Sequence, residues 1–408
     1  MKVLHINQSD IAGGAAIAAY RLHQGLKNIG VDSRLLVPQA ILNEKTTTIL
    51  PPMSLAERVY FKLTRKLLPN NTNLIRSWRM LKMDSYRQAD VINLHNLHTG
   101  LYFNYLTIPR IAREKPVVFT LHDMWSFTGH CAYSYDCERW QIGCGKCPYP
   151  TTYPAMQWDN SAIERWLKNR VYSQSKLTIV TPSQWLSNLA QSSILGRFPI
   201  HTIPYGIDTD IFYPMDKTLS RHKLDLPTRA VVLMFGCADL QDYRKGMDLL
   251  VRLLQGLPER LKTNLTLYAM GHDSSDAGDI AGIRTVHAGY VENDEEKARC
   301  YSAADVFIST TRADNLPLVL QESMACGTPM LASKVGGIPD LVRDGVTGFA
   351  VAPDDEAGML QRLVELIENA QLRQEMSAQC RQIALIEYTT EAIAQKYATL
   401  YDNLLQPQ

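Results

Sequence analysis

Short apolar runs rich in β-branched residues recur along the whole chain, and longer stretches with helical spacing lie between them. The runs are too short for helices and lack strict alternation, which is typical of strands that are buried on both faces of a sheet. The sequence therefore predicts strands at residues 3–6, 35–37, 91–94, 117–121, 178–181, 231–235, 265–270, 306–309 and 330–332.

The clearest helical spacing occurs at residues 15–26, 318–326, 357–367 and 389–405. Strands that alternate with helices predict βαβ units and a mostly parallel sheet. Because the series is too long for one doubly wound sheet, we expect two domains joined by a linker near Tyr205. Their predicted bounds are 1–204 and 205–385, with a C-terminal helix, 386–408, that can pack back onto the first domain.

The composition is that of an ordinary soluble protein, with 46% apolar and 20% charged residues. Lysine plus arginine (42) nearly balances aspartate plus glutamate (41), which argues against a dedicated nucleic-acid binder, because such proteins carry a basic excess. No apolar run reaches the roughly 18 residues that a membrane-spanning helix needs. The first ten residues include polar side chains and no signal-peptide core, so we expect a mature, cytoplasmic protein.

A glycine pair, Gly13 and Gly14, follows the first predicted strand and opens the first helix. Glycine permits positive φ and close backbone approach, which leaves N–H groups of the helix N-terminus open to a ligand. The segment is not G-x-G-x-x-G, and G-x-x-x-x-G-K-[ST] occurs nowhere in the chain, so neither a dinucleotide fingerprint nor a P-loop is predicted. From these residues alone, a tight turn and a ligand cradle are equally good interpretations.

The densest group of chemically capable residues lies just after the eighth predicted strand. We expect a helix to begin there at Asn315, a favoured N-cap, with Pro317 in its first turn and Gly327 just past its end. The N–H groups of such a first turn, near Leu316, can bind an anion without a metal.

Two carboxylates accompany this helix. Asp314 lies directly ahead of it, and Glu322 lies roughly 10–12 Å further along the axis. Carboxylates accept hydrogen bonds from paired sugar hydroxyls, and a diphosphate between them needs N–H donors and cations, so a sugar nucleotide fits this layout. Either acid alone would be interpreted as a solvated residue on a helix face, but the whole arrangement favours a binding site.

The segment resembles the donor site of family 4 glycosyltransferases with the GT-B fold, whose signature is E-x7-E ahead of an A-C-G-T-P-V-V stretch and a G-G-x-x-E turn. Asp314 takes the place of the first acid, one methylene shorter than the usual Glu, and Glu322 is the second acid with seven residues between them. The D-N-L-P sequence is typical of a branch of the family. The resemblance implies substrate-binding roles for Asn315, Leu316, Pro317 and Leu318.

Other segments extend the resemblance along nearly the whole chain. The family's G-R…K-G phosphate-binding loop is matched with Cys237 in place of the usual arginine, which leaves Arg244 and Lys245 as the cations. The linker is similar to P-N-G-I-D, with Tyr205 in place of Asn. The remaining matches lie beside the donor sugar, in the acceptor-side glycine loop and near the nucleotide base: His122, Gly13, Gly14, Gly271 and Tyr290.

The resemblance implies a GT-B α/β protein, in which two Rossmann-like domains with mostly parallel sheets face each other across a cleft. It implies a retaining transferase that moves a hexose from a nucleotide sugar, UDP-glucose or a related UDP-sugar, to a saccharide or lipid-linked acceptor in polysaccharide biosynthesis. Residues 1–204 would hold the acceptor and residues 205–385 the donor, and catalysis would require no cofactor.

In this mechanism the acceptor attacks on the face from which the diphosphate leaves. Arg244, Lys245 and the helix N-terminus would stabilise the charge on the leaving group, and His122, Asp314 and Glu322 would complete the catalytic set. Two alternatives stay open: a GT-B sugar-nucleotide epimerase, and a zinc-dependent binding scaffold with a degenerate donor site.

Four of the eight cysteines fall within seventeen residues: Cys131, Cys137, Cys144 and Cys147. Thiols this dense in a cytoplasmic protein suggest a tetrahedral structural metal, for which Zn²⁺ is the best candidate. Only the last two have the usual C-x2-C spacing, so disulfides and unpaired thiols remain alternatives. We expect no catalytic role, because four cysteine ligands leave no open position on the metal.

A basic stretch precedes the third predicted strand, residues 91–94. Residues 58–87 contain eight basic side chains against one acid, and leucine or valine recurs beside them at positions 55, 59, 63 and 67. A basic amphipathic segment can lie on an anionic leaflet, so peripheral contact with the inner face of a membrane is one of two equally good interpretations. The alternative is a surface helix whose apolar side packs on the core.

Overall fold

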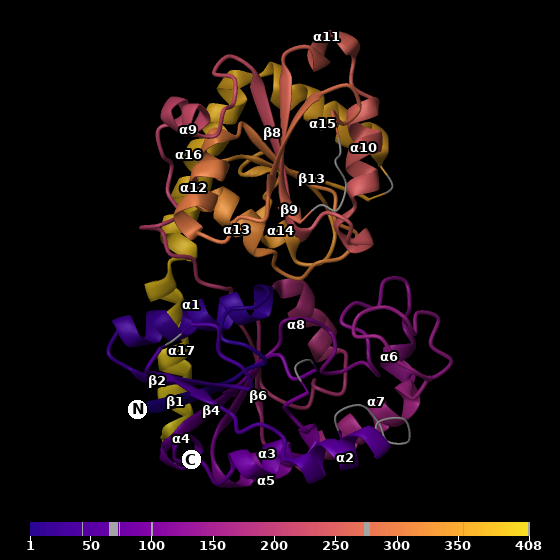
Figure 1. The fold of residues 1–408 in the computed structure, drawn as a ribbon, viewed down its shortest axis with the longest axis vertical. Coiled ribbons are helices and arrows are strands. Elements are labelled where there is room, and N and C mark those ends of the chain that lie inside the picture. The colour runs from indigo at the N-terminus through magenta and orange to yellow at the C-terminus, as the bar shows by residue number, and fades with distance from the viewer. Residues whose placement is uncertain are drawn as a thin grey trace. The chain divides into compact units, whose positions relative to one another are not determined.

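The computed structural model describes residues 1–42, 44–64, 72, 74–98, 101–272, 278–353 and 355–406. The chain forms two compact units, Met1–Gly206 together with Thr390–Gln408, and Ile207–Thr389 (Figure 1). The chain therefore passes from the first unit to the second after residue 206 and returns after residue 389. The sequence predicts these boundaries after residues 204 and 385.

The first unit is built on a seven-stranded sheet in which every pairing is parallel. In sheet order the strands are β3 (Thr47–Ile49), β2 (Asp32–Val37), β1 (Lys2–Ile6), β4 (Val91–Leu94), β5 (Val117–Thr120), β6 (Thr178–Thr181) and β7 (Ile200–Thr202). Its helices are α1 (Gly14–Asn28), α2 (Leu55–Thr64), α3 (Arg76–Met80), α4 (Asp84–Gln88), η1 (Tyr105–Thr107), α5 (Ile108–Glu114), α6 (Arg139–Ile142), α7 (Ser161–Tyr172), α8 (Gln184–Gln191) and α17 (Thr390–Leu405).

Helices cover both faces of this sheet, which explains its continuous apolar strands. Successive residues of a strand point to opposite faces. Leu4 and Ile92 accordingly belong to one buried cluster, while Val3 and Val91 belong to another. The expectation of strands buried on both sides is confirmed for the central strands.

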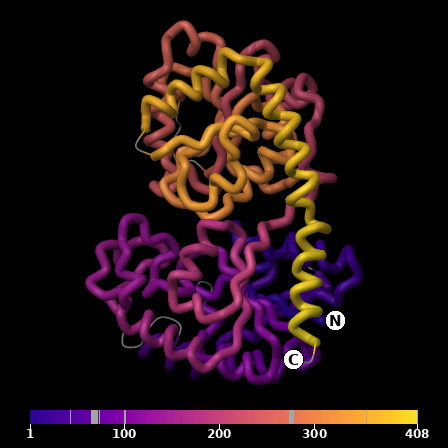
Figure 2. Tube along the Cα trace, turned by 180° about the vertical axis from the view of Figure 1, so that it is seen from behind, coloured from indigo at the N-terminus to yellow at the C-terminus, as the bar shows by residue number. Residues whose placement is uncertain are grey.

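The last helix belongs to the first unit although it follows the second in the sequence. In Figure 2 the yellow α17 runs beside the indigo N-terminal segment. Tyr397 and Tyr401 of α17 share a buried cluster with Leu22 and Leu26 of α1. The two helices approach so closely that a Cβ on Gly25 would lie 2.9 Å from the Thr390 carbonyl oxygen.

The second unit contains a six-stranded sheet, again parallel throughout. In sheet order the strands are β10 (Arg284–Gly289), β9 (Leu265–His272), β8 (Val231–Asp239), β11 (Val306–Ser309), β12 (Met330–Ser333) and β13 (Gly348–Val351). Its helices are α9 (Lys217–Lys223), η2 (Tyr243–Lys245), α10 (Met247–Gln255), α11 (Glu259–Lys262), α12 (Asp294–Ala303), α13 (Leu318–Ala325), α14 (Ile338–Leu341), α15 (Glu356–Glu368) and α16 (Ala370–Glu387).

All nine predicted strands are present, and the predicted parallel α/β class is confirmed. The structure adds β3, β7, β10 and β13, which form the outer edges of the two sheets. The segment between β7 and β8, for which no helix is predicted, contains α9. None of the described helices combines the length and the hydropathy that a membrane span requires.

Candidate functional site

The loop after β8 carries the two predicted cations and is fastened to the loop after β11. Asp242 caps η2 by accepting a hydrogen bond from the Arg244 amide at 2.9 Å. The Arg244 carbonyl in turn accepts from the Arg312 amide and from the Thr311 hydroxyl, both at 2.8 Å. Because β8 and β11 are neighbours, both loops leave the sheet at the same edge and form one hydrogen-bonded platform.

A second set of contacts fixes this platform from the side of α10. The Arg312 guanidinium binds both carboxylate oxygens of Asp248, at 2.8 and 2.6 Å, and lies 3.9 Å from the centre of the Tyr243 ring. The hydrogen bond from Arg312 lowers the pKa of Asp248 to about 2. Arg312 thus has a structural partner of its own, which leaves Arg244 and Lys245 as the cations nearest to Asp314.

Asp314 pairs with both predicted cations through one oxygen. Its Oδ2 lies 2.7 Å from Lys245 Nζ and 3.1 Å from Arg244 Nη1, and the residue is only 8% exposed. Burial alone would raise the pKa of Asp314, but the charges of Lys245 and Arg244 outweigh burial and hold that pKa below its usual value. Arg244 Nη2 also lies 3.3 Å from Asp242 Oδ2, so two carboxylates pair with the two cations of this group.

Glycine is required where the platform loops cross. Gly246 has φ +75°, and a Cβ there would overlap the Thr310 carbonyl oxygen. Gly336, the first residue of the Gly336–Gly337 pair, has φ +56°, and its Cβ would overlap the carbonyl oxygen of Asp314. Both positions combine a left-handed backbone with a close approach that any side chain would block.

The helix after Asp314 begins later than predicted. The N-cap of α13 is Pro317, and Asn315 is not a cap; the Asn315 amide donates to Asp314 Oδ1 at 3.0 Å instead. Proline disfavours the α conformation of the residue before it, so Leu316 cannot continue a helix into Pro317. The predicted C-terminus is confirmed, since Gly327 follows the helix with φ +70°.

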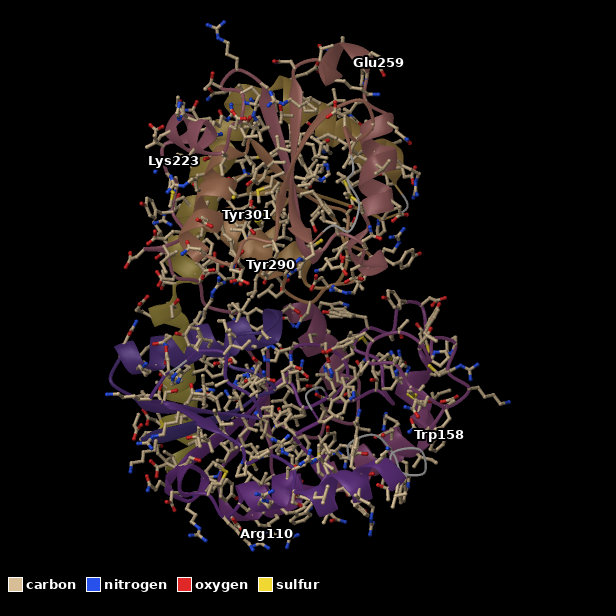
Figure 3. The ribbon with its side chains drawn as sticks, viewed as in Figure 1. Arg110, Trp158, Lys223, Glu259, Tyr290 and Tyr301 are labelled. Atoms are coloured by element: carbon tan, nitrogen blue, oxygen red, sulfur yellow. The ribbon has the colours of Figure 1, made fainter. Side chains whose placement is uncertain are left out.

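Glu322, the second predicted acid, lies inside α13 and is 4% exposed. Its Oε2 accepts a hydrogen bond of 2.9 Å from the hydroxyl of Tyr301, which α12 supplies (Figure 3). Sequence reasoning missed Tyr301, because a single tyrosine on an amphipathic helix carries no spacing signal.

An aromatic pair lies where β9 and β10 end. Tyr290, a predicted contact of the nucleotide base, is 43% exposed and labelled in Figure 3. Its ring stacks on His272 with centroids 4.6 Å apart and planes 5° from parallel. Gly271 has φ +150°, and a Cβ there would overlap the Cys237 carbonyl oxygen, so the last residues of β9 and β8 approach each other closely.

In the first unit the predicted glycine pair begins α1. Gly13 is the N-cap with φ +86°, and its carbonyl accepts from the amides of Ala16 and Ile17, both at 3.0 Å. A Cβ on Gly14 would meet nothing within 4 Å, and both glycines are exposed. The N-terminus of this helix of 15 residues is therefore open.

His122 follows β5 and takes part in a chain of hydrogen-bonding groups. Its Nδ1 lies 2.8 Å from Tyr205 Oη, and its Nε2 lies 3.1 Å from His95 Nδ1. Burial lowers the pKa of His122 to about 4, although the neighbouring Asp123 carboxylate opposes the shift. Asp123 itself lies 2.9 Å from His98 Nε2.

The four clustered cysteines line one small cavity together with His130 and Trp140. His130 Nε2 lies 3.2 Å from the Cys147 sulfur, and the Gly129 amide donates to the Cys144 sulfur at 3.2 Å. All eight cysteines are free thiols. Among the described residues, no three His, Cys, Asp or Glu side chains are grouped closely enough to hold a metal ion, so the zinc site stays a prediction.

The basic stretch divides into buried and exposed parts. Arg76 is buried and donates to the carbonyls of residues 50 and 51, and Arg79 pairs with Glu57 at 3.0 Å. Arg58, Lys62, Lys82 and Arg87 are exposed. Arg65, Lys66 and Leu67 lie outside the described residues.

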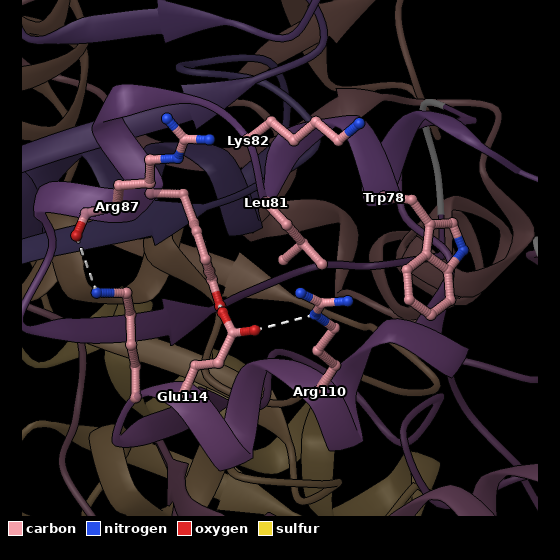
Figure 4. A pocket seen from close by; sticks show the side chains of 8 residues that line it. Trp78, Leu81, Lys82, Arg87, Arg110 and Glu114 are labelled. Carbon is pink, nitrogen blue, oxygen red and sulfur yellow. Dashed lines mark hydrogen bonds and ion pairs between the residues drawn. The ribbon is translucent and has the colours of Figure 1, made fainter.

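The apolar side of α2 is not packed on the core. Leu55, Val59 and Leu63 are 73%, 51% and 70% exposed. Nearby, Trp78, Lys82, Arg87 and Arg110 line a surface pocket of about 600 Å³ together with Leu81, Tyr86, Glu114 and Lys115 (Figure 4). Only one of those eight lining residues is acidic.

Two known families match successive parts of the chain. Residues 12–211 match the family described as Glycosyltransferase Family 4, and residues 229–369 match the one described as Glycosyl transferases group 1. The chain is a glycosyltransferase of the family 4 type. Along its whole length this glycosyltransferase is also similar to WcaC of Escherichia coli (strain K12), named as a colanic acid biosynthesis glycosyl transferase, with 26% identity over 99% of this chain and 100% of WcaC.

Solved structures share the fold of the glycosyltransferase. Sucrose-phosphate synthase from Thermosynechococcus elongatus aligns with a TM-score of 0.72 and 18% identity, over 99% of this chain and 98% of that chain. HepE from Anabaena, in complex with UDP-glucose, aligns with a TM-score of 0.69 and 17% identity, over 99% and 100%. The predicted GT-B fold class is thereby confirmed.

Proposed function

We propose that this glycosyltransferase moves a hexose from a UDP-sugar to a saccharide or lipid-linked acceptor, with retention of the anomeric configuration, in polysaccharide biosynthesis. The observation that carries the proposal is the pairing of Lys245 and Arg244 with Asp314 on the platform beside α13. The relative WcaC is named for colanic acid biosynthesis, and HepE was solved with UDP-glucose, which supports this donor class and this kind of product.

The electrostatics of the platform suit a leaving diphosphate. Arg244 and Lys245 both contact Asp314 Oδ2, and Asp242 and Asp314 hold these two cations in place for the two negative phosphates. The first amides of α13 have no partner within the helix and add a second set of donors for an anion. Because Asp314 is already the counter-ion of Arg244 and Lys245, we assign it to holding these cations and Glu322 to the donor hydroxyls.

The reaction then needs little covalent chemistry from the protein. The acceptor oxygen forms a bond to the anomeric carbon on the face from which the bond to the diphosphate breaks. The acceptor proton passes to an oxygen of the leaving diphosphate. Arg244 and Lys245 stabilise the charge that grows on this group, a contribution that typically amounts to about 10²–10³ in rate for a single donor.

The remaining predicted residues have complementary roles in this proposal. The stacked pair of Tyr290 and His272 offers an exposed aromatic face for the nucleotide base. The open N-terminus of α1 at Gly13 and Gly14 would bind the acceptor or a phosphate carried by it. His122 would lie beside the transferred sugar.

Transfer is tested with a panel of nucleotide sugars and saccharide acceptors, and NMR of the product reports the anomeric configuration. Lys245→Met should lower kcat by about 10²–10³ with the fold intact. Lys223→Met on α9, an exposed lysine away from the platform, is the matched control and should keep wild-type turnover. Wild-type turnover in Lys245→Met would overturn the assigned role.

The donor incubated alone separates this proposal from the epimerase alternative. A transferase should give slow hydrolysis to the free hexose, whereas an epimerase would give a second nucleotide sugar of the same mass. Nucleotide-sugar binding without turnover on any acceptor would instead indicate a binding scaffold.

We further propose that α2 and the neighbouring basic pocket contact an anionic membrane surface, where a lipid-linked acceptor would reside. Leu55, Val59 and Leu63 are exposed on one helix, and the exposed Arg58 and Lys62 accompany them. An apolar face that packs on the core would be buried, so these exposures favour the membrane over the alternative.

Co-sedimentation with vesicles of phosphatidylglycerol and phosphatidylcholine tests this surface. Replacing Leu55, Val59 and Leu63 together with serine should abolish binding, because the apolar area for insertion is lost. Leu219→Ser is a control, since Leu219 is 53% exposed on α9 in the second unit. Equal binding by the triple variant and the wild type would contradict the proposal.

A further inference from the structure

Three histidines and a tyrosine form a continuous hydrogen-bonded chain in the first unit. His5 lies in β1, His95 directly follows β4, and His122 follows β5, and these strands are neighbours in the sheet. His5 Nδ1 lies 3.0 Å from His95 Nε2, and His95 Nδ1 lies 3.1 Å from His122 Nε2. Tyr205 Oη completes the chain 2.8 Å from His122 Nδ1.

We propose that this histidine chain acts as one unit that fixes which ring nitrogen of His122 carries the proton, so that His5, His95 and Tyr205 are positioning residues for His122. The consequence for transfer rests on the proposed function of the His122 loop. The concerted proton arrangement is independent of that function, because it follows from the geometry of the first unit alone.

Counting protons shows why the chain must be concerted. A neutral imidazole has one N–H donor and one bare nitrogen acceptor, and each inner imidazole has a neighbour at both nitrogens. His95 can therefore donate to only one neighbour and must accept from the other. Either all three histidines carry the proton on Nε2 and Tyr205 donates to His122, or all three carry it on Nδ1 and Tyr205 accepts.

The surroundings keep the chain neutral, which the counting requires. His5 is fully buried and His95 is 2% exposed. Burial lowers the pKa of both. His23 lowers the pKa of His5 further, and His5 and His122 lower the pKa of His95 further. The titratable groups facing the chain are His23 beside His5, and His98 and Asp123 beside His122; only Asp123 favours a charged imidazole.

The two ends of the chain differ in environment. His5 Nε2 is buried, and no described group is within hydrogen-bond reach of it. Tyr205 at the other end is only partly buried, and its ring stacks on His122 with centroids 5.5 Å apart. It lies one residue before the end of the first unit's N-terminal segment, where the chain passes into the second unit.

The two states of the chain differ at its Tyr205 end. Tyr205 donates to His122 in one state and accepts from His122 in the other, so the proton position on His122 and the hydrogen-bonding role of Tyr205 toward it are set together.

Heteronuclear NMR of the full chain with isotope-labelled histidine tests the arrangement, because nitrogen shifts distinguish the two tautomers from the charged ring. At neutral pH we expect His5, His95 and His122 to share one tautomer. His95→Phe keeps an aromatic ring but breaks the chain, and it should leave His122 as a mixture of tautomers. Different tautomers among the three in the wild type, or an unchanged His122 in His95→Phe, would overturn the proposal.

Two further variants guard against a folding defect. His95→Gln retains one donor and one acceptor and should restore a single tautomer at His122. Tyr205→Phe, at the less buried end, should shift the His122 Nδ1 signal and leave the fold unchanged. His23→Gln is the matched control, since His23 is a buried histidine that hydrogen-bonds Ser33 and Thr46 outside the chain and should leave the His122 tautomer as it is.

Kinetics separates the positioning role from the proposed function. His95→Phe should lower kcat by up to about 10²-fold with little change in the KM for the donor, and His95→Gln should recover part of the loss. Equal kcat in His95→Phe and the wild type would remove the positioning role even if the tautomers change. A wild-type protein without transfer activity would overturn the proposed function and leave the NMR result standing.

Discussion

Replacing the buried His23 with glutamine should make the stability of the first unit less sensitive to acid. His23 is fully buried, and burial, aided by Lys27, lowers its pKa to about 4. In the unfolded chain a histidine has a pKa near 6.5. Between these values the unfolded state binds a proton that the folded state does not, so stability rises with pH through this window and is complete above about pH 6.5.

The magnitude follows from the shift. A difference of about 2.5 pKa units corresponds to about 3 kcal/mol in full, and about 2 kcal/mol of it is lost between neutral pH and about pH 5. His23→Gln also loses the ring's hydrogen bonds to Ser33 and Thr46, so we expect lower stability at neutral pH. The decisive quantity is therefore the difference between the two pH values, which should shrink by about 2 kcal/mol.

Urea unfolding followed by tryptophan fluorescence reports on the first unit alone. All six tryptophans lie within it: Trp78, Trp125, Trp140, Trp158, Trp166 and Trp185. His201→Gln, on the exposed edge strand β7, is the control and should keep the wild-type pH dependence. A pH dependence of His23→Gln equal to that of the wild type would refute the reasoning.

Three further predictions concern the other sites. Gly246→Ala should destabilise the second unit in thermal unfolding by more than the roughly 1–3 kcal/mol typical of a strained backbone, because its Cβ also overlaps the Thr310 carbonyl oxygen. Gly345→Ala is the control: Gly345 has φ +73° and its Cβ would meet no atom within 4 Å, so this variant should show the effect of backbone strain alone. Asp314→Asn should tighten binding of UDP without a sugar in calorimetry, since it removes one of the two carboxylates that pair with the cations of the platform; weaker binding would contradict the counter-ion role. Elemental analysis of protein purified without chelator should find one zinc per chain at residues 131–147, whereas no zinc together with four reactive thiols would exclude that site.

The strands that the sequence did not reveal are the outer ones of each sheet. Central strands such as β6 are buried on both faces, and their sequences are continuous runs of mostly apolar residues. β3 and β7 have a neighbour on one side only. β3 contains two threonines and the exposed Ile49, and β7 exposes His201 and Thr202. β10, with its alternating polar residues, is similarly open. A pattern based on burial cannot find β3, β7 and β10, because none of their residues is buried.

In the candidate site, spacing identified residue types but not their partners. The seven-residue interval located Asp314 and Glu322, because both follow the same strand and share one segment of chain. The pairing of Asp314 with Lys245 joins residues 69 positions apart, and that of Glu322 with Tyr301 joins residues 21 apart, so each depends on how neighbouring strands and helices pack. The late start of α13 was foreseeable from Pro317, whose effect on Leu316 outweighs the capping preference of Asn315.

The histidine chain was hidden for the same reason. His5 and His95 are separated by 90 residues, and each taken alone is an ordinary polar residue in or beside an apolar strand. Only the strand order β1-β4-β5 brings them into line with His122. Sequence reasoning singled out His122 through the family resemblance and gave no sign of its neighbours.

The return of α17 to the first unit means that the second unit is an uninterrupted insertion in the first. Both of its ends are suitable points at which to excise it from the chain. Ile207 and Thr389 form a parallel bridge, so the excised segment would begin and finish at one point. On the other side of each cut, a Cβ on Gly206 would lie 3.0 Å from the Thr390 Cα, so a short engineered turn could reclose what is left. Each half could then be expressed separately, whereas cutting the gene once after residue 206 would strip the first half of the helix that covers its sheet.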